Sequence, residues 1–184
     1  RNEHIDAYDW IDMTKDALIG CEPSIIKQCL HIKDESGKSL LNEDGYTHWE
    51  LIDLAIWSDK FRPSMRSNED RLQILLDAGV DVNVKNTRGE TVLMRACEQG
   101  HDTVVKQLIE KNADINAKDV RGKTALMYAC EQGHDTVVTQ LIKKNADINA
   151  KDAYRGTALM RACKQGHDTI VKQLIEKNAD INAK

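Results

Sequence analysis

Residues 96–119 read ACEQGHDTVVKQLIEKNADINAKD, and residues 129–152 repeat this text as ACEQGHDTVVTQLIKKNADINAKD, 33 positions later and with two substitutions. A third copy, ACKQGHDTIVKQLIEKNADINAK, runs from residue 162 to residue 184. Self-similarity at a fixed period of about 20–50 residues is the sequence signature of a repeat architecture. The sequence therefore predicts a stack of structural repeats in place of a single globular core.

Each copy carries two apolar clusters with helical spacing, separated by a glycine. In the middle copy they are Leu126, Met127, Ala129 and Cys130, followed by Val137, Val138, Leu141 and Ile142. Each cluster predicts one face of a short helix. Isolated helices shorter than about 12–15 residues are marginal in water, so only stacking against a neighbouring copy can stabilise these two helices.

Polar residues at the ends of the clusters predict where the helices begin and end. Thr124 is expected to cap the first helix, and Gly133 to separate the two helices. Asp135 opens the second helix, where a carboxylate favours the positive end of the helix dipole. Asn145 is expected to end that helix in the left-handed conformation. The polar, turn-rich stretch that follows predicts a projecting hairpin-like loop, with Ile148 as its large apolar anchor.

Three motifs of the repeat match a known family. They are DVRGKTALMYAC at 119–130, Gly133 with His134, and NADIN at 145–149. Over residues 84–184 the chain resembles the ankyrin repeat family. The resemblance implies an all-α solenoid of stacked helix-turn-helix units with projecting β-hairpin-like loops. In this family the histidine of the Gly-His pair is a structural residue at the turn between the two helices.

The chain departs from the family pattern at two kinds of position. Valine or alanine fills the proline position, and methionine fills the histidine position after it, at Met94, Met127 and Met160. We expect packing of methionine to compensate for the hydrogen-bond partner that the threonine cap loses. In the last copy Arg155 occupies the position of Gly122, so that turn is expected to differ in conformation or to carry strain.

The first half of the chain matches the same template less closely. LQILLDAGVDVN at 72–83 predicts the second helix and exit of a divergent repeat, whose first helix is expected within 44–57. About eight extra residues near 58–68 predict a lengthened loop between these helices. The predicted organisation is a cap-like helix pair at 1–43, a divergent repeat at 44–85, and three near-identical repeats at 86–184, of which the last is truncated.

Composition is that of an ordinary soluble protein, with 41% apolar and 30% charged residues among 184. Neither a membrane-spanning run nor a leader is recognised, so a cytoplasmic location is expected, with the nucleus as an open alternative. For a secreted effector the location would be the cytoplasm of a host cell. Three of the five cysteines, Cys97, Cys130 and Cys163, recur at the repeat spacing and predict small buried thiols in a reducing compartment. Because the chain begins with Arg1 and ends with Lys184 inside a repeat, both ends are expected to be boundaries of a piece.

The sequence carries no recognised catalytic or metal-binding pattern. His101, His134 and His167 form a column with one histidine in each repeat. Packed helices lie roughly 10 Å apart, whereas zinc ligands lie about 2 Å from the ion, so such a column cannot converge on a metal. The sequence therefore predicts no enzyme, no cofactor and no metal site.

Differences between the copies gather at the turns and first helices. In proteins similar to this one these elements line a concave surface that grips another protein. Carried onto this sequence, the candidate contacts are Arg88, Glu90, Arg95, Arg121, Lys123, Tyr128, Tyr154, Arg161 and Lys164. A surplus of arginine and lysine favours an acidic partner segment. A secondary candidate is the loop with Phe61, Arg62 and Met65.

Three functions are weighed. The first is a protein-binding scaffold without chemistry of its own, with a protein or peptide as partner and neither a membrane nor a small-molecule substrate. The second is the targeting or regulatory part of a larger enzyme or secreted effector. The third is nucleic-acid binding by the repeat half, where residues 84–184 carry 17 basic and 13 acidic side chains. The acidic residues Glu90, Glu98 and Glu131 on the same surface argue against the third.

Overall fold

The computed structural model describes residues 49, 52–53, 68–77 and 79–182. The chain forms two compact units, Arg1–Asn86 and Thr87–Lys184. The predicted cap-like pair at 1–43, the lengthened loop at 58–68 apart from its last residue Asn68, and the candidate residues Phe61, Arg62 and Met65 lie outside the described residues. The division into cap, divergent repeat and three repeats stays a prediction. In the part of the chain that is described, no helix has the length and apolar character needed to cross a membrane.

The first unit contains helix α4 (Asn68–Asp77), which lies where the second helix of the divergent repeat is predicted. Leu72 and Leu75 are completely buried. Gly79 follows the helix with a left-handed φ of 92°, and the Val80 N–H donates to the Leu75 carbonyl over 3.2 Å. This closure satisfies a carbonyl that the end of a helix would otherwise leave without a partner.

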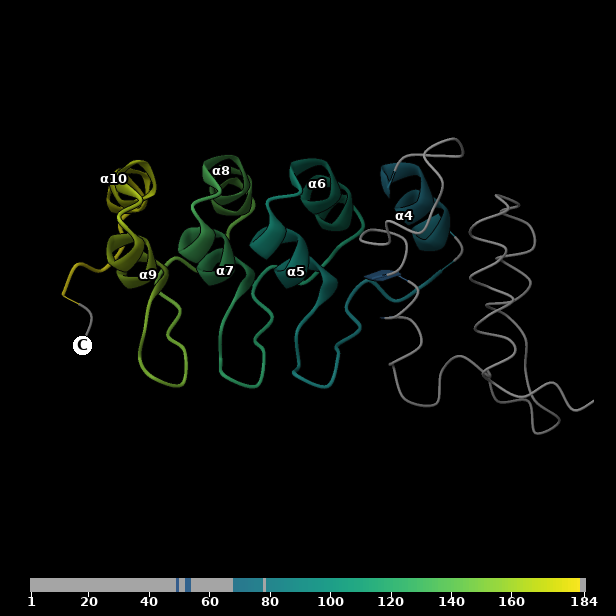
Figure 1. Cartoon of the computed structure of the whole chain (residues 1–184), viewed down its shortest axis with the longest axis horizontal. Coiled ribbons are helices and arrows are strands. Elements are labelled where there is room, and N and C mark those ends of the chain that lie inside the picture. Colours follow the sequence, from purple (N-terminus) through teal and green to yellow (C-terminus); the bar gives the residue numbers. More distant parts are fainter. Residues whose placement is uncertain (1–48, 50–51, 54–67, 78, 183–184) are drawn as a thin grey trace, which may run out of the picture. The chain divides into compact units, whose positions relative to one another are not determined.

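The second unit is built from three helix pairs. They are α5 (Val92–Gln99) with α6 (Asp102–Glu110), α7 (Ala125–Gln132) with α8 (Asp135–Lys143), and α9 (Ala158–Gln165) with α10 (Asp168–Glu176). In Figure 1, α5, α7 and α9 form one row and α6, α8 and α10 a second row, with loops projecting below the first. This arrangement confirms the predicted all-α solenoid with projecting loops.

A threonine caps the first helix of each pair, as the sequence predicts. The buried hydroxyls of Thr91, Thr124 and Thr157 accept hydrogen bonds from backbone N–H groups three residues later, over 3.3–3.4 Å. In α5 the Met94 sulfur also accepts from the Thr91 N–H over 3.4 Å. Methionine at this position therefore does more than pack, because at α5 it takes over an acceptor role as well.

The second helix of each pair ends at an asparagine in the left-handed conformation, with φ of 63–64° at Asn112, Asn145 and Asn178. At the middle pair, the Ala146 N–H donates to the Leu141 carbonyl over 3.0 Å and the Asn145 N–H to the Ile142 carbonyl over 3.1 Å. This double closure is a Schellman motif. The anchor of the following loop differs from expectation, because Ala146 is buried whereas Ile148 is only half-buried. Ala150, further along the loop, is buried as well.

Burial in one pair depends on the pair that follows it. Met127 and Cys130 are completely buried in α7, which contacts both α5 and α9. The equivalent Met160 in α9 is 39% exposed and Cys163 is exposed, which corrects the prediction of three buried thiols. The same side chains therefore belong to the core only where a neighbouring repeat covers them.

Polar contacts tie successive repeats together at three places. At the loop tips the Val120 N–H donates to the Arg88 carbonyl over 3.1 Å, and at the helix exits the Asp147 N–H donates to Asn116 Oδ1 over 2.8 Å. At the inter-helix turn, His134 Nε2 lies 3.0 Å from the Glu98 carbonyl oxygen. All three contacts recur one repeat later, including His167 Nε2 at 3.3 Å from the Glu131 carbonyl.

The turn between the paired helices also fits sterically into its neighbour. Gly133 has a φ of 81°, and a Cβ added there would lie 2.5 Å from the imidazole ring of His167 in the next repeat. Gly100 relates to His134 in the same way. Glycine is therefore required at these turns both for the left-handed backbone and for the space that the next histidine fills. The structural role predicted for the histidine is confirmed and extends across the interface.

This fit predicts different costs for two chemically identical substitutions. Gly133→Ala and Gly166→Ala each introduce a left-handed alanine, at about 1–2 kcal/mol. Only at Gly133 would the new methyl group collide with a histidine ring, because nothing lies within 4 Å of a Cβ at Gly166. We expect Gly133→Ala to lower the free energy of unfolding by about 1–3 kcal/mol more than Gly166→Ala, as the His167 hydrogen bond is lost.

Urea unfolding followed by circular dichroism measures both losses, since every tryptophan lies in the first 57 residues and fluorescence would miss the repeats. In a His167→Ala background, where the ring and its hydrogen bond are already absent, Gly133→Ala should cost no more than Gly166→Ala. Equal losses for the two glycine variants would show that the ring does not set the requirement.

Candidate partner-binding surface

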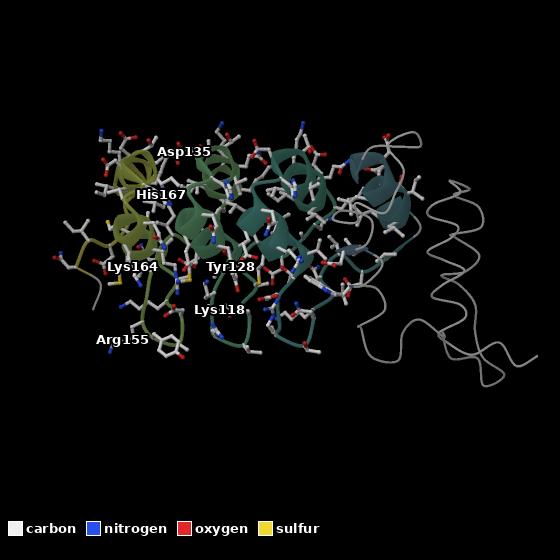
Figure 2. All side chains as sticks on the ribbon, in the orientation of Figure 1. Lys118, Tyr128, Asp135, Arg155, Lys164 and His167 are labelled. Atoms are coloured by element: carbon white, nitrogen blue, oxygen red, sulfur yellow. The ribbon has the colours of Figure 1, made fainter. Side chains whose placement is uncertain are left out.

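The residues predicted to contact a partner lie on the inner helices α5, α7 and α9 and on the loops that project from them. Tyr128 lies on the side of α7 that faces the loops, and Arg155 lies at a loop tip (Figure 2). Hydrogen bonds from the Val120 N–H to the Arg88 carbonyl and from the Ala153 N–H to the Arg121 carbonyl fix the spacing of the tips. The loops thus form an ordered edge.

A buried aspartate organises each of the last two loops. Asp119 Oδ1 accepts from the backbone N–H groups of Arg121 and Lys123, each over 2.8 Å. Asp152 Oδ1 accepts in the same way from Tyr154 and Gly156, over 2.8 and 2.7 Å. At each carboxylate, two backbone N–H donors take the place of water. These hydrogen bonds fix the turn at the tip of the loop.

The second oxygen of each aspartate binds a side chain of the inner helix. In the middle repeat the Tyr128 hydroxyl donates to Asp119 Oδ2 over 2.9 Å. In the last repeat the Arg161 guanidinium donates to Asp152 Oδ2. Tyrosine and arginine at the same repeat position therefore perform the same task, which is to tie the loop to its helix.

Glu131 joins the two repeats by ion pairs. Its carboxylate lies 2.7 Å from Lys123 Nζ and 3.1 Å from Arg161 Nη1. The Lys123 ammonium also lies 4.0 Å from the centre of the Tyr128 ring, a cation–π contact. Because Arg161 holds both Glu131 and Asp152, the contacts form one network across the interface between α7 and α9.

The network shifts the acidities of its members. Burial raises the pKa of the Glu131 carboxyl, but hydrogen bonds and charge from Lys123 and Arg161 outweigh it and leave the pKa below 4.5. The pKa of Asp152 is likewise lowered, because the Gly156 N–H and Arg161 outweigh burial. Burial, together with the bond to Asp119, raises the pKa of Tyr128. These three groups therefore keep their neutral-pH charge states over a wide range of pH.

The nine predicted contact residues differ in exposure. Those that are exposed are Arg88, Arg121, Tyr154 and Lys164; those that are half-buried are Glu90, Arg95, Lys123 and Arg161; Tyr128 is buried. Lys123, Tyr128 and Arg161 belong to the network, and Glu90 pairs with Arg88 over 3.1 Å. The predicted column of inner-helix side chains is thus largely engaged in holding the scaffold, whereas the tips present their side chains to solvent.

Two exposed tip residues were absent from the predicted set. Val120 is 71% exposed beside Arg121, and Arg155 is exposed beside Tyr154, which is itself 82% exposed. A signal for Arg155 was available, because an arginine at a glycine position already indicated an unusual turn. No comparable signal marked Val120, since a valine in a loop predicts burial as readily as exposure.

Comparison with family models shows which family the chain belongs to. A model described as ankyrin repeats (3 copies) matches residues 64–152 and 119–184, which is more than half of the chain. The chain belongs to the ankyrin repeat family. Ankyrin repeats are typically non-catalytic domains that bind other proteins, and the coarse functional prediction is therefore supported.

Two curated relatives match short segments of the chain. Both are from Oryza sativa subsp. japonica and are named Probable E3 ubiquitin-protein ligase XBOS32 and XBOS33. The chain is 42% identical to the first over 43 residues and 51% identical to the second over 39 residues. The matches cover 23% and 21% of this chain but only 9% and 8% of the relatives.

The thiols of the ankyrin core have little capacity for chemistry. Burial raises the pKa of Cys130 to about 12 and that of Cys97 still further, so both stay protonated at neutral pH. Among the described residues, no group of three histidine, cysteine, aspartate or glutamate side chains is arranged to hold a metal ion.

The last ankyrin loop keeps its shape although arginine replaces glycine. Arg155 has a φ of 64°, close to the 75° of Gly122, and its N–H donates to the Asp152 carbonyl as the Gly122 N–H donates to that of Asp119, both over 3.0 Å. Of the two outcomes that the sequence left open, strain in an unchanged turn is the one observed. A side chain in this conformation costs about 1–2 kcal/mol.

Relieving this strain should stabilise the protein. We expect Arg155→Gly to raise the free energy of unfolding by about 0.5–1 kcal/mol, because the relief exceeds the extra freedom that glycine gives the unfolded chain. Arg121→Gly is the matched control, since Arg121 is also an exposed tip arginine but does not have a positive φ. That variant should lose about 0.4–1 kcal/mol. Chemical unfolding of both variants tests the opposite signs, and the same sign for both would contradict the assignment of strain to Arg155.

Proposed function

We propose that this ankyrin domain binds an extended, acidic segment of a partner protein along its row of loop tips. The observation that carries the proposal is the ordered edge of exposed side chains at successive tips, which includes Arg88, Arg121, Tyr154 and Arg155. Arginine and tyrosine are the residue types that contribute most to binding at protein interfaces. Membership of a family whose repeats bind proteins supports the same function.

Charge and spacing favour an extended acidic occupant. The tips are joined by backbone hydrogen bonds, so their arginines recur at the distance between stacked repeats, roughly 10 Å. An extended chain rises about 3.3 Å per residue, so one carboxylate at every third residue would meet each tip in turn. Guanidinium groups pair with carboxylates through two parallel hydrogen bonds, which supplies both attraction and orientation.

The strain at Arg155 supports a binding role for this side chain. Strained backbone persists where the surrounding structure enforces it, and it concentrates at functional sites. Arg155 is exposed, lies beside the exposed Tyr154, and replaces a glycine that the turn would accommodate without cost. Tyr128 and Arg161, by contrast, bind the aspartates of their loops. Replacing them would therefore change the stability of the fold as well as the binding of a partner.

Selection of random twelve-residue peptides displayed on phage tests this function on the full chain. We expect the enriched peptides to carry net negative charge and to bind more weakly at high salt. Their affinity should fall at least tenfold for Arg121→Glu with Arg155→Glu. The matched control is Lys172→Glu with Lys177→Glu, because both lysines are exposed and lie in or directly after the outer helix α10, away from the tips.

Two results would contradict the proposal. One is enrichment of neutral or basic peptides. The other is a loss of affinity that is equal for the tip variant and the control variant, since this would indicate a general charge effect. Binding of duplex DNA with an affinity above that for the acidic peptides would favour the nucleic-acid alternative in their place.

A second candidate is the partner-recruiting part of a larger enzyme. Two relatives are named as E3 ubiquitin-protein ligases, and the similarity covers less than a tenth of their length. Their remaining length leaves room for other domains, and this chain would then supply the contact with a partner. A transcript that joins these repeats to a catalytic domain in one reading frame would establish this function.

A further inference from the structure

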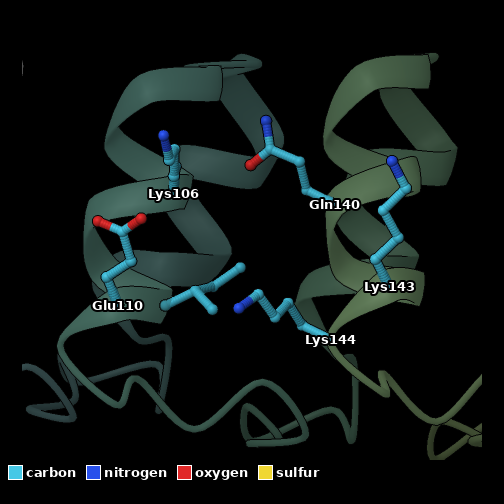
Figure 3. Close-up of a pocket in the computed structure, with 6 residues that line it drawn as sticks. Lys106, Glu110, Gln140, Lys143 and Lys144 are labelled. Carbon is cyan, nitrogen blue, oxygen red and sulfur yellow. The ribbon is translucent and has the colours of Figure 1, made fainter.

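A pocket of about 300 Å³ lies between the outer helices α6 and α8, away from the loop tips. Figure 3 shows the side chains around it. Lys106 and Glu110 extend from α6, Gln140 and Lys143 extend from α8, and Lys144 is the residue that caps the end of α8. Ile109 of α6 completes the lining. The volume is at the small end of the range of roughly 300–1,000 Å³ that is typical of ligand pockets.

The equivalent space between α8 and α10 is bridged by side chains. There Gln173 Nε2 donates to Thr139 Oγ1 over 2.6 Å. At the α6–α8 interface the equivalent positions hold Gln140 and Lys106. A lysine has no acceptor for the glutamine amide, and its longer chain extends to solvent. One of the two substitutions between residues 96–119 and residues 129–152 thus removes the bridge where the pocket lies.

The second substitution makes the pocket basic. Lys143 occupies the position that glutamate holds in the other two copies, at Glu110 and Glu176. The lining therefore carries three ammonium groups, from Lys106, Lys143 and Lys144, against one carboxylate. Both positions at which these two copies differ contribute to the one pocket.

The lining also offers an apolar surface and an unused acceptor. Ile109 and the methylene chains of the lysines present apolar atoms. Gln140 Oε1 is buried and accepts no hydrogen bond from any described residue, and the same holds for Gln173 Oε1 at the bridged α8–α10 interface, so this acceptor does not distinguish the pocket. A fitting ligand thus has an anionic group and a short apolar body.

We propose that the α6–α8 pocket binds a carboxylate carried on a short apolar body. The carboxylate pairs with the ammonium groups of Lys106 and Lys143, and the apolar body lies against Ile109. A single negative charge suits the site better than a phosphate dianion, because the Glu110 carboxylate lies on the same rim. This chemistry is that of a free medium-chain carboxylic acid or of a glutamate next to leucine in a protein segment. The proposal is independent of partner binding at the loop tips.

Titration of the ¹⁵N-labelled full chain, followed by amide chemical shifts, tests this site with defined probes. Hexanoate supplies the charge and the apolar body together, whereas acetate and inorganic phosphate supply charge alone and 1-hexanol the apolar body alone. The blocked dipeptide N-acetyl-leucyl-glutamate amide represents a protein segment. We expect saturable shifts around Ile109, Gln140 and Lys143, with hexanoate or the dipeptide binding at least tenfold more tightly than the other three probes. The tighter of the two identifies the source of the carboxylate.

Variants taken from the chain's own copies supply the controls. Lys106→Thr recreates the threonine–glutamine bridge observed at Thr139 and Gln173, and should lower affinity for hexanoate and the dipeptide at least tenfold. Lys143→Glu restores the residue of the other two copies and should do the same. Lys172→Thr makes the first substitution at the equivalent position of α10 and should leave affinity unchanged.

Several outcomes would overturn the proposal. They are the absence of saturable shifts with both hexanoate and the dipeptide, equal affinity for acetate or phosphate, and equal effects of Lys106→Thr and Lys172→Thr. Each of these would leave peptide binding by the tip arginines intact, so the two sites can fail separately.

Discussion

The fit of each repeat against the next is the interaction on which the rest of this structure depends. Its helices are only eight or nine residues long in the second unit, too short to persist alone. Apolar faces such as Leu126 and Leu141 are buried because neighbouring pairs enclose them. The histidine ring of each following repeat occupies the space that a glycine leaves without a side chain. This contact fixes the position of one repeat against the next. Hydrogen bonds at the loop tips, and others just after the second helices, then align the loops of successive repeats.

Local chemistry explains why so much of the fold could be predicted from the sequence. Threonine caps, glycine turns and left-handed asparagines act on their own backbone, so Thr124, Gly133 and Asn145 are readable without a neighbour. Features that depend on a neighbour were harder to predict. The same methionine is buried at 127 and exposed at 160, because its environment is set by the presence of another helix pair. Ile148, expected to be the apolar anchor of its loop, is likewise only half-buried, whereas the nearby Ala146 is buried.

On the candidate surface, too, some features could be predicted from the sequence and others depended on neighbouring residues. Comparison of the copies correctly placed the variation at turns and first helices, but it could not distinguish residues that vary to contact a partner from residues that replace one another within the scaffold. Tyr128 and Arg161 differ in chemistry yet both bind the aspartate of their loop. Only side-chain geometry separates them from Arg155, which contributes strain to the fold and whose exposed side chain is open to other contacts. Outer helices that looked nearly invariant, in turn, contain the two differences that open a pocket.

Residue-level hydrogen exchange on the native chain measures most directly whether the repeats are held by their neighbours. If they are, His167→Ala weakens one interface only. The free energy of opening should then fall by about 1–3 kcal/mol for amides of α9 and α10, while amides of α5 and α6 keep their protection. A uniform loss over all of these helices would instead reveal one indivisible cooperative core and contradict the account.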